Sequence, residues 1–164
     1  MKNKTLRYTL TVLLSVVLLF TLSGCNLGEM KQNDGYVASV KELVNQCINY
    51  NRTLKKQEEV FNCHDVEKTK QLVSTMDTLG DVYQQLLQLQ PTNEFAEYHS
   101  QITERATMAL SCISRLKTLV NYSAEHGNDK LYQNDKGEIL DEYTADCEML
   151  RWVSSEIQTY WRNA

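Results

Sequence analysis

Apolar side chains recur every three or four residues over most of the chain, and this spacing is the feature that most constrains the fold. The first run begins at Tyr36 and reaches Phe61, and only Gln57 interrupts it. Three further runs have the same spacing: Leu72 to Leu86, Phe95 to Val120 and Leu140 to Trp161. Side chains at this spacing share one face of an α-helix. The sequence therefore predicts four amphipathic helices.

The joints between these runs indicate how the helices pack. Asp65 is placed to cap the start of the second helix, Pro91 follows the end of that helix, and Gly127 ends the third. Pro91 is the only proline in the chain, so no helix is interrupted by one. Because the joints near 62–65 and at Pro91 are short, the helices that they connect should be antiparallel neighbours. We predict an all-α fold, an up-down four-helix bundle, over residues 35–164.

The third joint, GNDKLYQNDKGEI at residues 127–139, differs from the other two. Its segment 134–137 is typical of a turn, and Leu131 and Ile139 flank that turn. This pattern predicts a tiny β-hairpin between the third and fourth helices. Calcium binding is not expected, because an EF-hand loop centred on Gly137 would lack most of its side-chain oxygens.

The N-terminal segment has the pattern of an export signal. Lys2, Lys4 and Arg7 precede an uncharged apolar run, YTLTVLLSVVLLFTL at residues 8–22, which ends at small residues. A permanent membrane span needs about 20 apolar residues, which is more than this run supplies. We predict a signal peptide over residues 1–24.

The end of this segment, Leu22-Ser23-Gly24-Cys25, resembles the lipobox of bacterial lipoproteins. The resemblance implies cleavage between Gly24 and Cys25, a diacylglyceryl group on Cys25 and a position on the extracytoplasmic side of a cell membrane. It leaves open whether that membrane is an inner or an outer one. Two acyl chains anchor a protein stably, whereas one holds it only marginally. No cofactor besides this covalent lipid is expected.

A short polar segment separates the lipidated cysteine from the bundle. Residues 26–34, NLGEMKQND, have no apolar period, so residues 25–34 are predicted to be the lipidated cysteine and a tether. The bundle that follows is loosely similar to small helical lipoproteins with no assigned activity, around LQLQPTNEFAEYHSQITERATMAL. That similarity supports the fold and implies no site residue.

Charge limits the partners that we expect. The whole chain has a formal net charge of −4, and the signal peptide carries three basic residues and no acidic one, so its removal leaves −7. An acidic domain has no electrostatic reason to bind nucleic acid or to lie on anionic lipid. The lipid anchor, rather than the protein surface, is expected to provide the membrane affinity.

Four cysteines follow Cys25, and helix geometry limits how they can pair. Cys47 and Cys63 would lie roughly 24 Å apart on one helix, beyond the reach of a disulfide. We predict at most one disulfide, joining Cys147 to either Cys112 or Cys63. The alternative is four buried thiols that pack as small apolar groups.

The sequence lacks the short motifs of metal sites and enzymes. No two cysteines have two-residue spacing and there is no Glu-x-x-His, so we predict no metal site. His64, His99 and His126 are expected in capping or surface positions. A glycine-rich phosphate loop and a Gly-x-Ser-x-Gly motif are absent from the sequence, so an enzyme is not expected.

These observations favour a membrane-anchored helical interaction module that binds another envelope protein or an envelope polymer. Trp152 lies off the core stripe beside Arg151 and is the candidate contact residue. One alternative is a bundle that senses a small ligand or a metal, for which Gln57 and the cysteines are the only hints. An envelope enzyme is the third reading.

Overall fold

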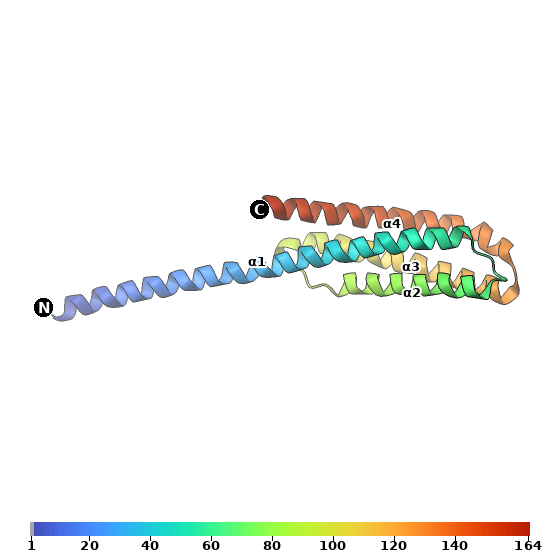
Figure 1. Ribbon diagram of the computed structural model, residues 1–164. Helices are drawn as coiled ribbons and strands as arrows, with labels where there is room; N and C mark the ends of the chain where they lie inside the picture. Colours follow the sequence, from blue (N-terminus) through green and yellow to red (C-terminus); the bar gives the residue numbers. More distant parts are fainter. Residues whose placement is uncertain (1) are drawn as a thin grey trace. The chain divides into compact units, whose positions relative to one another are not determined.

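The computed structural model describes the backbone of residues 2–164 and the side chains of residues 28–164 (Figure 1). Two compact units are present, Met1–Gly35 and Tyr36–Ala164. The predicted lipobox, with Gly24 and Cys25, lies outside the residues whose side chains are described.

Four α-helices and one 3₁₀ turn make up the described chain. They are α1 (Lys2–Glu59), α2 (Val66–Gln88), η1 (Asn93–Phe95), α3 (Ala96–His126) and α4 (Asp129–Asn163). Helix α2 packs against α3, and α3 packs against α4. Residues 2–164 contain no β-strand, so the predicted all-α class and the four helices are confirmed.

The helix ends follow from local chemistry. The Asp65 side chain accepts a hydrogen bond of 3.1 Å from the backbone N–H of Lys68 and caps α2, as predicted. Gly127 ends α3 in the left-handed conformation, with φ 59°, which glycine adopts without strain. Leu89 is extended just after α2, two residues before Pro91.

The apolar faces of the helices form one core within Tyr36–Ala164. Large side chains from all four helices are fully buried in it; they include Leu54, Leu72, Tyr83, Leu116, Tyr143 and Leu150. Burying a side chain of this size contributes about 1.5 to 3 kcal/mol to the stability of a fold. The buried apolar faces therefore stabilise the four-helix arrangement, as the sequence pattern predicts.

The predicted β-hairpin is wrong, because residues 129–163 form the single helix α4. Asn128 caps this helix by accepting a hydrogen bond of 3.2 Å from the Lys130 backbone. Tyr132 and Ile139 are seven residues apart on one face and both are buried. The ring of Tyr132 packs on Phe61 with centroids 4.4 Å apart. This long-range contact outweighs the turn preference of the segment around Gly137.

Residues 26–34, the predicted tether, belong to α1. From Gly28 to Asp34 their side chains are exposed apart from Asn33. Among the described residues, no helix is both long enough and apolar enough to cross a membrane.

Candidate metal centre

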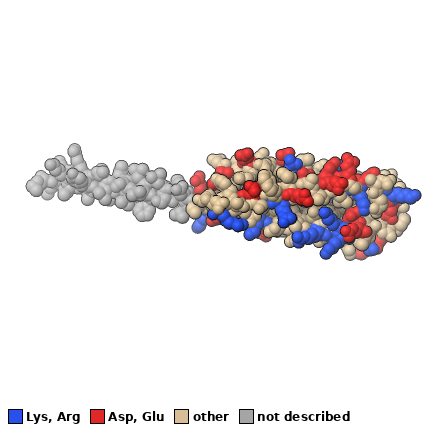
Figure 2. Space-filling model, turned by 90° about the horizontal axis from the view of Figure 1, so that it is seen from above, with Lys and Arg blue, Asp and Glu red and all other residues tan. Residues whose placement is uncertain are grey.

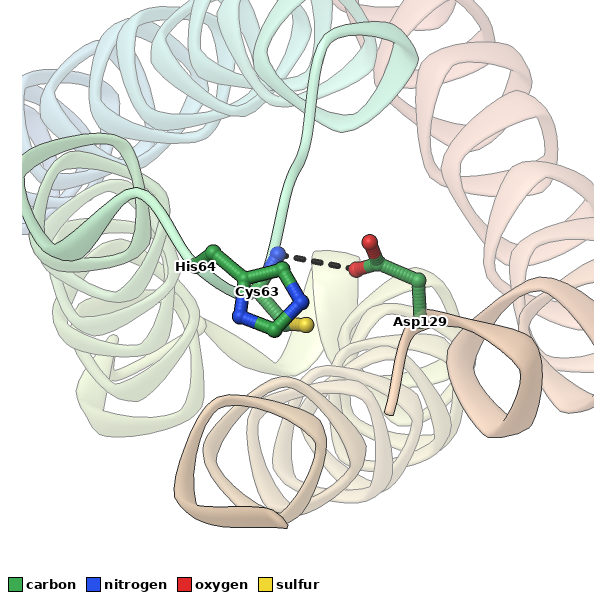
Figure 3. Close-up of side chains that lie close together, drawn as sticks. All are labelled: Cys63, His64 and Asp129. Carbon is green, nitrogen blue, oxygen red and sulfur yellow. Dashed lines mark hydrogen bonds between the residues drawn. The ribbon is translucent and has the colours of Figure 1, made fainter. Parts of the chain in front are cut away.

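Three metal-ligating side chains meet at one end of the Tyr36–Ala164 unit. Cys63 and His64 lie in the joint between α1 and α2, and Asp129 is the first residue of α4. One ligand atom from each residue lies within 4.8 Å of the other two (Figure 3). The cluster thus joins segments that are 66 residues apart in the chain.

Backbone hydrogen bonds hold this joint in shape. The Cys63 N–H donates to Asp129 Oδ1 at 2.8 Å, which ties the joint to the start of α4. The Asn62 side chain accepts from the His64 N–H at 2.9 Å, and the Asn62 carbonyl accepts from the Asp65 N–H at 2.9 Å. An asparagine that bonds the backbone two residues on is a typical turn former. The joint therefore presents Cys63 and His64 side by side.

Gly127 allows the close approach of His64. A Cβ atom at Gly127 would lie 3.1 Å from His64 Cε1, which is tighter than nearly all real contacts. Gly127 therefore has two roles: its left-handed φ ends α3, and its lack of a side chain leaves room for the His64 imidazole.

The three side chains differ in exposure. Cys63 is buried, with 4% of its surface exposed, Asp129 is half-buried and His64 is exposed. A buried thiol, a half-buried carboxylate and an exposed imidazole form a site that an ion can enter from solvent on the His64 side.

Each pKa shift in the cluster has an identifiable cause. The hydrogen bonds from the Cys63 backbone and thiol lower the pKa of Asp129; burial opposes them, and the charge of His64 adds the smallest effect, a further lowering. Desolvation and then Asp129 raise the pKa of the Cys63 thiol. Without a cation the thiol is thus a neutral donor to Asp129, and a bound cation would take the place of its proton.

A thiolate, an imidazole and a carboxylate are the ligands of zinc-type ions, whereas calcium and magnesium prefer oxygen alone. Zinc ligands lie about 2.0 to 2.3 Å from the ion, which places the donor atoms of a tetrahedral site about 3.5 Å apart, so atoms that lie within 4.8 Å of one another need to approach by at most about 1 Å. Asp129 Oδ1 already accepts from Cys63, which leaves Oδ2 for an ion. Three protein ligands leave a fourth coordination position open.

The remaining cysteines occupy other environments. All four cysteines of the described side chains are free, so the structure shows neither of the pairings predicted for Cys147. Cys112 Sγ donates to the Glu142 carboxylate at 3.7 Å, and Cys147 Sγ lies 3.2 Å from the hydroxyl of Tyr83. Cys63 lies with His64 and Asp129 in the candidate metal centre.

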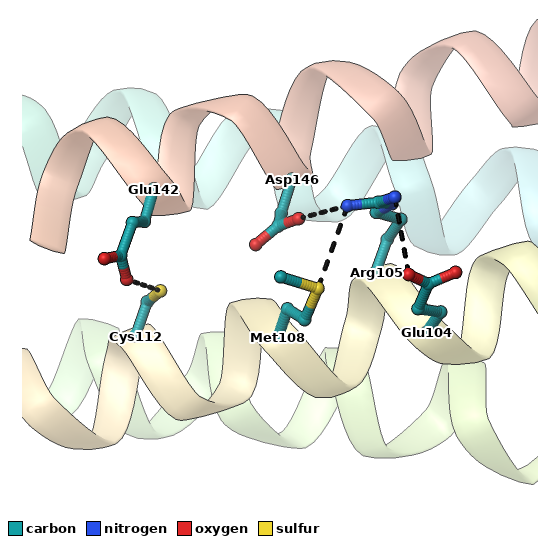
Figure 4. A network of polar contacts seen from close by, with 6 residues as sticks. All are labelled: Glu104, Arg105, Met108, Cys112, Glu142 and Asp146. Atoms are coloured by element: carbon teal, nitrogen blue, oxygen red, sulfur yellow. Dashed lines mark hydrogen bonds and ion pairs between the residues drawn. The ribbon is translucent and has the colours of Figure 1, made fainter.

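A polar network links α3 to α4 beside Cys112 (Figure 4). Arg105 lies 3.3 Å from Asp146 and 3.4 Å from Glu104, and it also contacts the sulfur of Met108 at 3.7 Å. Burial raises the pKa of Asp146, and Arg105 opposes that shift. The ion pairs and hydrogen bonds of this network hold α3 against α4, so we assign the network a structural role.

The other predicted residues lie apart from the cluster. Trp152 is exposed over 52% of its surface, in keeping with its place off the core stripe. His99 lies 3.1 Å from the hydroxyl of Tyr36 through its Nδ1 atom, and His126 stacks on Tyr122 at the end of α3. His64 is exposed in a joint, but it lies against a thiol and a carboxylate.

Comparisons with models of protein families, with curated proteins and with solved structures gave no match. The function must therefore be inferred from the residues of this chain. Among its described side chains, Cys63, His64 and Asp129 are the group with the ligand types and spacing of a metal site.

Proposed function

We propose that this protein is a membrane-anchored extracytoplasmic lipoprotein that binds a zinc-type divalent cation at Cys63, His64 and Asp129. The observation that carries the metal site is the convergence of three ligand atoms within 4.8 Å, from the α1–α2 joint and the start of α4. The function is binding rather than catalysis.

The anchor in this proposal is the diacylglyceryl group on Cys25, formed after cleavage behind Gly24. The pattern of a basic start, an apolar run and Leu22-Ser23-Gly24-Cys25 supports it. The domain then faces the outside of a cell membrane with a formal charge of −7, so nucleic acid is not a partner. Basic and acidic side chains both occur on the face seen in Figure 2, which offers no uniformly basic surface for a polyanion.

An up-down order of the helices belongs to the same proposal. Short joints connect α1 to α2 and α3 to α4, and the Cys63–Asp129 hydrogen bond of 2.8 Å joins those two joints at one end. Tyr36, near the other end of the bundle part of α1, stacks on Phe95 just before α3, with centroids 5.4 Å apart. In an up-down bundle the start of the bundle part of α1 and the start of α3 lie at the same end, and these contacts support that order.

A cation at this site would let the protein act as a metal sensor, because the ion would bridge the α1–α2 joint and the α3–α4 joint. It would tie Cys63 and His64 to Asp129 more strongly than the single hydrogen bond does. The open fourth position can hold water, a small ligand or a donor atom from a partner protein. Binding of the metal would thus change how firmly the α1–α2 joint is held.

The test is a cobalt titration of the full lipidated chain in detergent under reducing conditions. Cobalt bound to a thiolate gives a charge-transfer absorption in the near ultraviolet, so the signal reports Cys63 directly. We expect saturation at one ion per chain, competition by zinc, loss of the band in Cys63→Ser and weaker binding in His64→Ala, which removes one of the three ligands.

His126→Ala is the matched control, because this histidine is exposed at the end of α3 and lies outside the cluster. It should bind cobalt as the wild type does. Equal binding by all variants, or no thiolate band in the wild type, would contradict the proposed site.

A second candidate function is contact with an envelope protein through α4. Trp152 and Met149 lie three residues apart on that helix, so they are neighbours on its surface, and both are large, apolar and exposed, at 52% and 39%. Such a pair suits the centre of a protein–protein contact.

Cross-linking of the tagged protein in its native membranes tests this contact. A partner should be recovered with the wild type and with Tyr122→Ala, which removes an exposed aromatic side chain from α3 instead. Trp152→Ala should lose that partner. Recovery of the same proteins with all three chains would rule the contact out.

A further inference from the structure

Aromatic side chains from α1, η1, α3 and α4 gather at one end of the four-helix unit. Phe95, at the end of η1, lies at the centre of this group. The ring of Tyr36 stacks on Phe95 with centroids 5.4 Å apart. The rings of Tyr160 and Trp161, near the end of α4, meet Phe95 edge-on at 6.0 and 5.9 Å. Tyr98 of α3 lies 6.4 Å from Phe95 and 6.1 Å from Tyr160. We call these five residues the aromatic cluster.

The aromatic cluster is closed on its inner side and open on its outer side. Phe95 is fully buried, whereas Tyr160 is exposed over 42% of its surface, and Tyr98 and Trp161 are half-buried. The hydroxyl of Tyr160 donates to the Glu94 carboxylate at 3.0 Å. The outer side thus presents apolar rings with polar atoms at their rim. Tyrosine and tryptophan side chains of this kind are enriched where a membrane meets water.

The chain enters the four-helix unit at this cluster. Tyr36 is the first residue of the unit, and Cys25, the proposed lipidation site, precedes it by eleven residues. A segment of that length spans at most about 40 Å, even when it is fully extended. From Tyr36 to Glu59, α1 is about 35 Å long, and the joint with the candidate metal centre follows its end. The aromatic cluster therefore lies at the end of the unit to which the lipid is attached.

We propose that the open side of the aromatic cluster, made of Tyr98, Tyr160 and Trp161, rests in the headgroup region of the membrane that holds the lipid anchor. This contact rests on the proposed function, because it needs the lipid on Cys25. Once the acyl chains are inserted, contact between the cluster and the same membrane is an intramolecular step, for which a weakly binding surface is sufficient. The nearness of the bilayer favours lipid over a second protein as the occupant of this surface.

The contact would orient the domain rather than anchor it. Partly exposed rings bury less apolar area than an acyl chain, and a single acyl chain holds a protein only marginally. Zwitterionic lipid suits the contact, because Glu94 and the exposed Glu97 place negative charge beside the cluster. With the cluster on the membrane, the candidate metal centre would lie at the end of the domain away from the lipid, where ions and partner proteins can reach it.

Quenching of tryptophan fluorescence by brominated lipid tests the contact. The chain has two tryptophans, Trp152 and Trp161, and both belong to α4, about 14 Å apart along the helix. Trp152→Phe leaves Trp161 as the only tryptophan, and Trp161→Phe leaves Trp152. The full lipidated chain of each variant is placed in phosphatidylcholine vesicles whose acyl chains are brominated near the headgroup. Compared with unbrominated vesicles, Trp161 should lose fluorescence and Trp152 should retain it.

Two substitutions in the Trp152→Phe chain provide a matched comparison. Tyr160→Ser removes the most exposed ring of the cluster and should reduce the quenching of Trp161. Tyr122→Ser removes a similarly exposed ring, at 46%, near the other end of α3 and should leave the quenching unchanged. The circular dichroism of both variants should match that of the parent chain, which shows that the fold is kept.

Flotation of the vesicles separates the two ways in which the contact could fail. A chain that does not float with them would overturn the lipid anchor and the contact together. A chain that floats but shows equal quenching of Trp152 and Trp161, or no quenching of Trp161, would overturn the contact and leave the anchor standing. The same holds if Tyr160→Ser quenches as the parent chain does.

Discussion

At the scale of single residues, Tyr132 and Tyr83 are both fully buried, but their hydroxyl groups differ. The Tyr132 hydroxyl is buried without a hydrogen-bond partner, whereas Tyr83 donates to Tyr143. An unpaired buried hydroxyl opposes folding, and a paired one contributes about 1 kcal/mol. Two chemically identical substitutions should therefore have opposite effects.

Tyr132→Phe should leave the free energy of unfolding unchanged or raise it by up to about 1 kcal/mol, because it removes only the unpaired group. Tyr83→Phe should lower it by about 1 to 2 kcal/mol, because the hydroxyl of Tyr143 then loses its donor. Urea unfolding followed by circular dichroism measures both. A larger loss for Tyr132→Phe than for Tyr83→Phe would show that the hydroxyl environments are assigned wrongly.

At the scale of the elements, Asp146 makes the α3–α4 contact sensitive to pH. Burial raises its pKa against the opposing effect of Arg105, and the charges of Glu142 and Glu104 add to the rise. The folded chain then holds this proton to a higher pH than the unfolded chain, whose aspartates titrate near 3.9. The stabilisation from the protonated carboxyl is complete below that value and is lost as the pH rises through the raised pKa.

Asp146→Asn should remove this part of the pH dependence. The Tm of the wild type minus that of Asp146→Asn should fall between pH 4 and pH 7, because all other titrating groups are common to both chains. Asp141→Asn, an exposed aspartate of α4, is the control and should show no such trend. A difference for Asp146→Asn that grows with pH would show that folding lowers the pKa of Asp146 instead of raising it.

The sequence predicts α2 and α3 well because their signals are local. The spacing of the apolar residues identifies the buried face of each helix, Asp65 marks the start of α2, and Gly127 marks the end of α3. The first part of α4 was missed because the turn residues around Gly137 gave the stronger local signal. The packing of Tyr132 on Phe61 favours the helix over the turn. It joins residues 71 positions apart, so no local pattern in the sequence indicates it.

The candidate metal site was missed for the same reason. Cys63 and His64 are adjacent in a helix joint, and that pair is visible in the sequence. Their third partner, Asp129, becomes a neighbour only when the two joints meet. A search for cysteines at short spacing cannot find a site of this kind, but a Cys–His pair at a joint is a signal that such a search could include.

At the scale of the whole molecule, the anchor should decide where the protein is found. An acidic domain gains little from an anionic membrane, so in the proposed lipoprotein the membrane affinity comes from the lipid on Cys25. Cys25→Ala should move the protein from the membrane fraction to the soluble extracytoplasmic fraction or the medium. Immunoblots of the separated fractions measure this, with Cys112→Ala as a cysteine control that should stay in the membrane.

X-ray absorption at the zinc edge of the zinc-loaded full chain tests whether Cys63 ligates the ion, because it identifies and counts the ligand atoms around it. We expect one sulfur at about 2.3 Å and nitrogen or oxygen ligands at about 2.0 to 2.2 Å, in a four-coordinate site. A shell of nitrogen and oxygen alone would contradict it, because the ion would then be bound without the Cys63 thiolate.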